Sequence, residues 1–75
     1  MVKAIVLINV IPEKTEKIFN NIKKFPEIKE AFLVYGEYDA VLVINTKTTH
    51  DVQEFVREIR KINGVVRTVT VIEMI

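Results

Sequence analysis

Apolar residues along the chain gather in four short strand-like runs, and two helix-like segments with apolar residues at helical spacing lie between them. Residues 2–11 and 65–75 are rich in β-branched side chains, and two shorter apolar runs, 28–35 and 40–45, lie between them. These four segments are predicted to be strands. The two inner runs flank only a four-residue polar stretch, 36–39 (Gly-Glu-Tyr-Asp), so they are predicted to pair as an antiparallel hairpin with this stretch as its turn.

The first helix is predicted to begin at Pro12, because the fixed φ of proline suits a first helical turn. It is predicted to end before Pro26, since the residue before a proline is disfavoured in the helical region. Helical spacing places four apolar residues on its buried side: Ile18, Phe19, Ile22 and Phe25.

The second helix is predicted to begin after Thr48, with Asp51 three residues later in the pattern of a capping box. Its apolar residues again follow helical spacing: Val52, Phe55, Val56, Ile59 and Ile62. Gly64 follows this run and is predicted to be the left-handed residue that ends the helix.

The resulting order is βαββαβ, which predicts an α+β fold of the ferredoxin-like type over a single domain, 1–75. In this arrangement a four-stranded antiparallel sheet carries both helices on one face, and the first and third strands lie in the centre. At 75 residues the chain is a small domain, and such domains leave much apolar surface in water unless a disulfide, a metal or self-association compensates.

The strands are apolar on both faces, whereas a half-solvated antiparallel sheet alternates between apolar and polar residues. Consecutive apolar residues occur at 5–8, 32–34 and 41–44. A monomer would leave a wide apolar face in water, so we expect a homodimer packed sheet against sheet, as in a dimeric α+β barrel. An unusually hydrophobic monomeric sheet is the alternative.

Composition excludes several classes of protein. The absence of cysteine rules out disulfides and thiol chemistry and fits a cytoplasmic location. Eleven basic and ten acidic residues give a formal net charge of +1, far from the balance of a typical nucleic-acid binder. Each apolar run is shorter than the roughly 18 to 20 residues that cross a bilayer, so no membrane association is expected.

Catalytic chemistry has little support in the sequence. His50 is the single histidine, and without a nucleophile or an orienting partner it is expected to be a surface residue. No glycine-rich phosphate loop is present, and Glu37 with Asp39 is a weak candidate for a cation site. We therefore expect no enzymatic activity, no cofactor and no metal.

The stretch 36–39 admits two explanations. In the structural one, Gly36 takes a positive φ, Asp39 accepts backbone N–H groups and Tyr38 packs over the hairpin end. In the functional one, the glycine lets a ligand approach the main chain, and the carboxylate holds the ammonium group of a zwitterion such as an amino acid. Thr68 and Thr70 share one side of the last strand and would add hydroxyl groups.

Three features together resemble the effector-binding domain of the Lrp/AsnC transcription regulators, also called the RAM domain (regulation of amino acid metabolism). They are the βαββαβ order, the hairpin 34–39 and the later segment 64–70 (Gly-Val-Val-Arg-Thr-Val-Thr). The resemblance covers essentially the whole chain. It implies dimers that assemble further into rings and an effector, usually an amino acid, bound between dimers near the hairpin. Gly36, Tyr38 and Asp39 would then line the effector site, with Thr68 and Thr70 beside them.

The chain differs from full-length members of that family in two respects. Met1 leads directly into the first strand, where those members carry a DNA-reading helix-turn-helix, and Tyr35 stands where threonine is common. We therefore expect a stand-alone sensing and oligomerisation module that does not bind DNA itself and acts through its own assembly or by pairing with a full-length regulator. A small dimeric α+β barrel enzyme and a ligand-free structural oligomerisation module are the alternatives.

Overall fold

The computed structural model describes residues 1–74, so the end of the last predicted strand, at Ile75, lies outside the described residues. The elements follow one another in this order: strand β1 (Val2–Val10), 3-10 helix η1 (Pro12–Lys14), helix α1 (Thr15–Ile22), strand β2 (Ile28–Leu33), strand β3 (Ala40–Thr46), helix α2 (Thr49–Arg60) and strand β4 (Val65–Ile72). The predicted βαββαβ order is confirmed.

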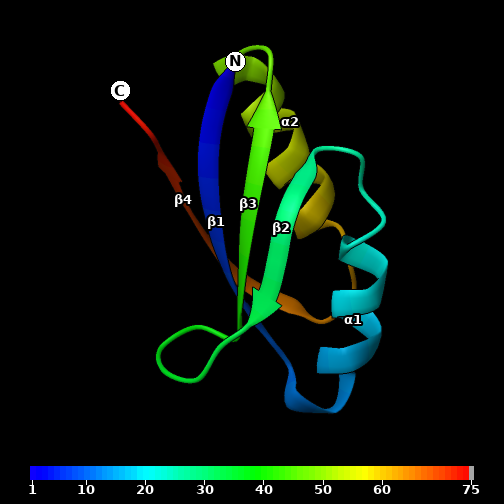
Figure 1. The fold of residues 1–75 in the computed structure, drawn as a ribbon. Helices are drawn as coiled ribbons and strands as arrows, with labels where there is room; N and C mark the ends of the chain where they lie inside the picture. The colour runs from blue at the N-terminus through cyan, green and yellow to red at the C-terminus, as the bar shows by residue number, and fades with distance from the viewer. Residues whose placement is uncertain (75) are drawn as a thin grey trace.

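The four strands form one antiparallel sheet in the order β2-β3-β1-β4, so the first and third strands are central, as predicted. Both α-helices lie on the same side of this sheet (Figure 1). The ferredoxin-like arrangement is therefore confirmed. Within residues 1–74, no helix combines the length and the apolar character needed to cross a membrane.

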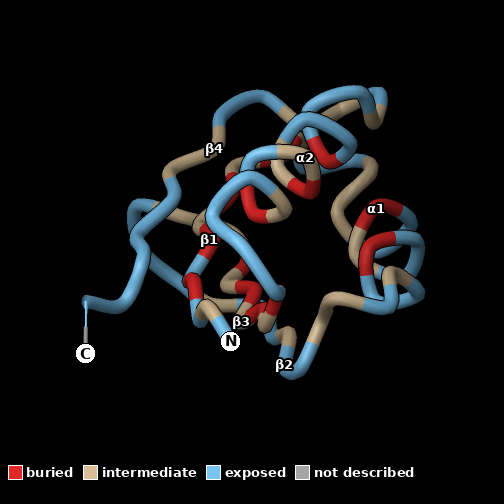
Figure 2. Tube along the Cα trace, turned by 90° about the horizontal axis from the view of Figure 1, so that it is seen from above, coloured by how far each residue is buried: buried red, intermediate tan, exposed pale blue. Residues whose placement is uncertain are grey.

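The core fills the layer between the sheet and the helices. In Figure 2 the buried parts of α1, α2, β1 and β3 surround this space. The buried hydrophobic side chains are Ala4, Val6, Ile8, Val10, Ile18, Ile22, Ala40, Leu42, Ile44, Val52, Phe55 and Ile59. Burial alternates strictly along β3, which means that every second residue of this central strand points into the core.

The first helix is shorter than predicted at both ends. Residues Pro12–Lys14 form a 3-10 turn, and the α-helix ends at Ile22 rather than near Phe25. A turn replaces the last predicted helical residues: the Phe25 N–H donates to the Ile22 carbonyl (3.0 Å), and the Ile28 N–H donates to the Phe25 carbonyl (3.2 Å). The Phe25 ring still packs edge-on against Phe55, with ring centroids 5.6 Å apart, so it contacts the core from a turn.

Helix α2 begins as predicted, because the Thr48 hydroxyl accepts a hydrogen bond from the Asp51 N–H (3.1 Å). Its end was predicted wrongly. The helix ends at Arg60, and Gly64 lies four residues beyond, in a turn closed by the Val65 N–H and the Ile62 carbonyl (3.2 Å). Gly64 has the expected positive φ (+107°), but it leads the chain into β4 rather than capping the helix.

The middle of the sheet face opposite the helices is apolar, and polar residues such as Lys3, Asn9 and Arg67 lie toward its ends. In the two central strands, Ile5 pairs with Val43 and Leu7 pairs with Val41. Apolar residues of the edge strands β2 and β4 lie beside these pairs on the same face. We call this surface the open sheet face; its apolar residues are Ile5, Leu7, Phe32, Val41, Val43, Val69 and Val71. Three of them are substantially exposed: Ile5 (38%), Phe32 (43%) and Val71 (53%). The predicted apolar second face is therefore present.

Candidate ligand-binding site

The segment 34–39 between β2 and β3 is a loop that protrudes beyond the end of the sheet (Figure 1). Its ends are paired, because the Val34 N–H donates to the Asp39 carbonyl (3.0 Å). The Asp39 N–H donates to the Ile8 carbonyl (2.9 Å), which ties the loop to the central strand β1. The loop therefore has a fixed base and an exposed tip.

The Asp39 carboxylate extends this attachment. Its Oδ2 accepts hydrogen bonds from the Val10 N–H (2.9 Å) and the Asn9 Nδ2 (3.4 Å). The pairing of β1 with β3 ends at Ile8 and Ala40. Val10 lies beyond this pair, where β3 offers no main-chain acceptor for its N–H, and the Asp39 carboxylate accepts that hydrogen bond instead. The expectation that Asp39 accepts a backbone N–H is confirmed.

Gly36 forms the exposed tip of the loop, with φ +136°, in a region that L-residues rarely adopt. No heavy atom lies within 4 Å of the place where a Cβ would stand. The neighbouring Tyr35 side chain is fully exposed. The backbone at the tip is therefore open to an approaching group.

Tyr38 is half-buried, and its ring lies under the Arg67 guanidinium of β4, with 5.6 Å between the Arg67 Cζ and the ring centroid. Arg67 pairs with Asn9 of β1, and a β-bulge in the β1–β4 pairing follows directly, between Asn9 and Val10. Sequence analysis did not identify Arg67, because a cation–π contact between residues so far apart in the chain depends on strand register.

Thr68 and Thr70 share the helix-facing side of β4, as expected, because they pair with Ile8 and Val6 of the core layer. The Thr68 hydroxyl accepts a hydrogen bond from the Arg60 Nε (3.0 Å) on α2. Thr68 and Thr70 line cavities beside α2, whereas Val34, Tyr35 and Asp39 line a separate cavity with Thr15 and Leu33.

Thr70 instead lines a cavity of about 430 Å³ between α2 and β4. Its apolar wall consists of Val52, Val56 and Ile72, and its polar lining consists of Gln53, Arg57, Arg60 and Thr70. A second cavity, of about 410 Å³, lies beside it at the start of β4 and is lined by Arg60, Val65, Val66, Arg67 and Thr68. Arg60 borders both cavities.

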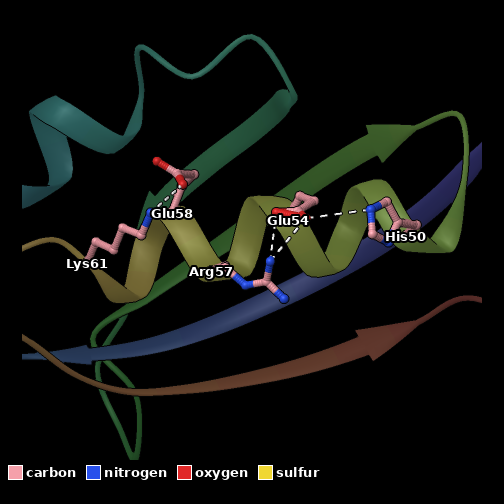
Figure 3. A network of polar contacts seen from close by, with 5 residues as sticks. All are labelled: His50, Glu54, Arg57, Glu58 and Lys61. Carbon is pink, nitrogen blue, oxygen red and sulfur yellow. Dashed lines mark hydrogen bonds and ion pairs between the residues drawn. The ribbon is translucent and has the colours of Figure 1, made fainter.

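The arginines differ in their partners. Arg57 contacts both carboxylate oxygens of Glu54 (3.1 and 3.2 Å), and Lys61 pairs with Glu58 (3.1 Å), as Figure 3 shows. His50 is exposed and lies 3.5 Å from Glu54, consistent with the surface position expected for it. Helical periodicity places Arg57 and Arg60 on the polar side of α2, and it cannot show that both residues line a cavity or that only Arg57 has an acidic partner.

No group of three or more histidine, cysteine, aspartate or glutamate side chains that would hold a metal ion occurs within residues 1–74. The polar groups around the two cavities are guanidinium, hydroxyl and amide groups. Guanidinium groups donate hydrogen bonds and carry a positive charge, which suits carboxylates more than metal cations.

The chain is similar to several known proteins. It is 36% identical over 69 residues to the HTH-type transcriptional regulator FL11 of Pyrococcus horikoshii, covering 92% of this chain and 46% of that protein. The chain therefore spans about half the length of this relative. The crystal structure of TTHA0845 from Thermus thermophilus has a TM-score of 0.94 and 28% identity, covering 99% of this chain and 94% of that one.

A third similarity concerns the fold alone. The crystal structure of the transcriptional regulator NMB0573 from Neisseria meningitidis, solved as a complex with L-Met, has a TM-score of 0.86 and 18% identity, covering 97% of this chain and 49% of that one. The sequence model of the Lrp/AsnC ligand binding domain matches residues 3–74. The chain therefore belongs to the family of Lrp/AsnC ligand-binding domains.

Proposed function

We propose that this domain is a small-molecule sensing and oligomerisation module that binds an amino acid and acts through changes in its assembly, without enzymatic activity. The observation that carries the proposal is the open sheet face of a Lrp/AsnC ligand-binding domain, apolar and uncovered by the domain's own helices. A domain that self-associates to cover this face can respond to a ligand by a change in its oligomeric state.

The first step of the proposal is a homodimer formed by two open sheet faces. The central row of this face runs Phe32, Val41, Leu7 and Val69 across all four strands. Such a continuous apolar surface is uncommon on a soluble monomer. A two-fold contact between identical faces is self-complementary and buries both together.

The second step is the ligand. The exposed backbone at Gly36 and the carboxylate of Asp39 offer groups for a zwitterion, and the hydroxyls of Thr68 and Thr70 lie near the α2–β4 cavities. Because these groups lie apart in one chain, we propose that protomers of neighbouring dimers complete the site. The bound L-Met in NMB0573 supports an amino acid as the class of ligand.

The third step couples binding to regulation. A ligand that contacts two dimers stabilises the assembly that contains this contact, and it shifts the equilibrium only as far as its affinities for the two assemblies differ. Since FL11 is a transcriptional regulator, we propose that the partner is either the same chain or a full-length Lrp/AsnC regulator in the cytoplasm. The domain itself is not expected to contact DNA or a membrane.

Native mass spectrometry of the purified protein, with and without the twenty amino acids, tests this function. We expect dimers or multiples of dimers that gain the mass of one kind of amino acid. Even-numbered assemblies that bind none of the twenty would leave a structural oligomerisation module in place of a sensor. A stable monomer at micromolar concentration would contradict the proposal at its first step.

Replacing Asp39 with alanine is expected to weaken amino acid binding by about tenfold or more while leaving the dimer intact. The change removes the acceptor of the Val10 N–H, and a buried donor without its partner costs about 1–3 kcal/mol, which loosens the base of the loop. Isothermal titration calorimetry with the amino acid found above measures the affinity. Glu37→Ala is the matched control, because only the main-chain carbonyl of Glu37 takes part in a described hydrogen bond.

The variant Asp39→Asn separates the two roles of this carboxylate. Asparagine keeps an oxygen that can accept the Val10 N–H but loses the negative charge. Binding as weak as in Asp39→Ala indicates that the charge itself contacts the ligand, whereas binding like that of the unmodified protein indicates that Asp39 only holds the loop. Unchanged affinity in Asp39→Ala would remove Asp39 from the site.

A further inference from the structure

We propose that the cavity of about 430 Å³ between α2 and β4 binds a short aliphatic monocarboxylate that carries no ammonium group, such as an aliphatic 2-oxo acid. The inference goes beyond the proposed function, because it adds a second class of ligand at a site within one protomer, separate from the 34–39 loop. It comes from an uncovered stretch of β4 and from the partners of the two arginines that border it.

The cavity exists because the helices do not cover the edge strand β4. Thr70 and Ile72 face the helices, since they pair with Val6 and Ala4, two core residues with no exposed surface (0%). Thr70 is nevertheless exposed, and Ile72 keeps 38% of its surface exposed. Figure 2 shows buried segments in β1 and intermediate to exposed segments in β4. The core layer is therefore open to solvent between α2 and β4.

One wall of this cavity is apolar. Val52 and Val56 lie one helical turn apart on the same side of α2, and Ile72 of β4 lines the cavity with them. Val52 is buried and Val56 is half-buried. The volume falls in the range of small-molecule sites, roughly 300–1,000 Å³. An aliphatic chain in the cavity covers this wall and leaves water together with it.

The two arginines that line the cavity differ in their partners. Arg57 contacts both carboxylate oxygens of Glu54 (Figure 3). The Arg60 Nε donates to the Thr68 hydroxyl (3.0 Å), and within residues 1–74 Arg60 takes part in no ion pair. This bond holds the guanidinium group by one edge and leaves the N–H groups of its two Nη atoms for a carboxylate. One guanidinium without an acidic partner matches one carboxylate.

The rest of the lining excludes an ammonium group. Among the described residues, no aspartate or glutamate lines this cavity, and its other polar groups are the neutral side chains of Gln53 and Thr70. An ammonium group would meet the positive charge of Arg60 without a carboxylate to offset it. The oxygen of a 2-oxo group, in contrast, can accept a hydrogen bond from the Gln53 amide or the Thr70 hydroxyl. The cavity therefore favours a 2-oxo acid over the amino acid with the same carbon skeleton.

Isothermal titration calorimetry of the full chain tests the class of ligand with three probes: α-ketoisocaproate, which has the carbon skeleton of leucine, L-leucine itself and pyruvate. We expect α-ketoisocaproate to bind at least about tenfold more tightly than pyruvate, because each buried methylene group contributes about fourfold. Equal binding of these two acids would remove the apolar wall from the site. L-leucine that binds as tightly as α-ketoisocaproate, and through Arg60, would overturn the selection against an ammonium group.

The variant Arg60→Gln is expected to weaken α-ketoisocaproate binding by about tenfold or more. Lys61→Gln is the matched control, because it removes the same charge from the end of the same helix, outside the cavity, where Glu58 already pairs with the lysine. Equal effects of the two variants would show that net charge alone attracts the ligand and would overturn the site. Unchanged affinity in Arg60→Gln would overturn it as well.

Failure of this inference differs from failure of the proposed function. Asp39→Ala is expected to leave α-ketoisocaproate binding unchanged, because Asp39 lines a different cavity. Binding of an amino acid without any binding of α-ketoisocaproate would overturn this inference and leave the amino acid sensor standing. Binding of α-ketoisocaproate through Arg60, with none of the twenty amino acids bound, would keep this site and overturn the amino acid sensor.

Discussion

Replacing Gly64 with alanine is expected to lower the free energy of unfolding by the sum of about 1–3 kcal/mol of backbone strain and about 1–3 kcal/mol of overpacking, which exceeds the loss from strain alone. Gly64 has φ +107°, which an alanine adopts only with strain. A Cβ there would lie 2.6 Å from the Ile18 Cδ1 and 3.2 Å from the Lys14 Cδ. Ile18 is a core residue of α1 with 2% of its surface exposed, so its side chain has little room to move away.

Urea denaturation followed by circular dichroism measures this loss, at one fixed protein concentration because self-association adds to apparent stability. Gly36→Ala is the matched control. It has φ +136° but no heavy atom within 4 Å of the added Cβ, so it carries strain of about 1–3 kcal/mol without overpacking. Equal losses in the two variants would contradict the close approach of the Gly64 turn to α1.

Replacing Leu7 with lysine is expected to raise the dissociation constant of the dimer by at least about 100-fold. Leu7 lies in the central row of the open sheet face, between Val41 and Val69. In a sheet-to-sheet dimer its side chain is surrounded by apolar groups of both protomers, where a lysine charge has no partner. The two-fold symmetry introduces the charge twice into one interface.

Analytical ultracentrifugation over a range of concentrations measures the dissociation constant. Asn20→Lys is the matched control, because it adds the same charge on the exposed surface of α1, away from the open sheet face. Leu7 points away from the core, so the far-ultraviolet circular dichroism of the monomer should match that of the dimer. A Leu7→Lys protein that remains dimeric would exclude this face as the interface.

The order of the elements follows from the sequence because short apolar runs mark the strands and helical spacing of apolar residues marks the helices. The first and last strands are also rich in β-branched residues, and Thr48 with Asp51 identifies the start of α2. The ends of the elements are less predictable. Helix α1 ends at Ile22 because a turn through Phe25 reaches β2, and this turn depends on the position of the sheet.

The candidate site is less predictable than the fold, because strand register decides which side chains meet. Positive φ at Gly36 and the backbone contact of Asp39 follow from the types of residue in a short loop. The contact of Arg67 with Tyr38 requires the pairing of β1 with β4, including the bulge beside Val10. The position of Arg60 over Thr68 likewise requires the packing of α2 on β4.

The strand order β2-β3-β1-β4 has a consequence for synthesis of the protein on the ribosome. The strand made first, β1, lies between β3 and β4, so both of its partners are translated long after it. Pairing between distant segments is slow, and an unpaired apolar strand is prone to aggregate in the meantime. The apolar residues 5–8 of a nascent chain therefore stay unpaired until β3 emerges, which makes this segment the natural target of a chaperone that binds during translation.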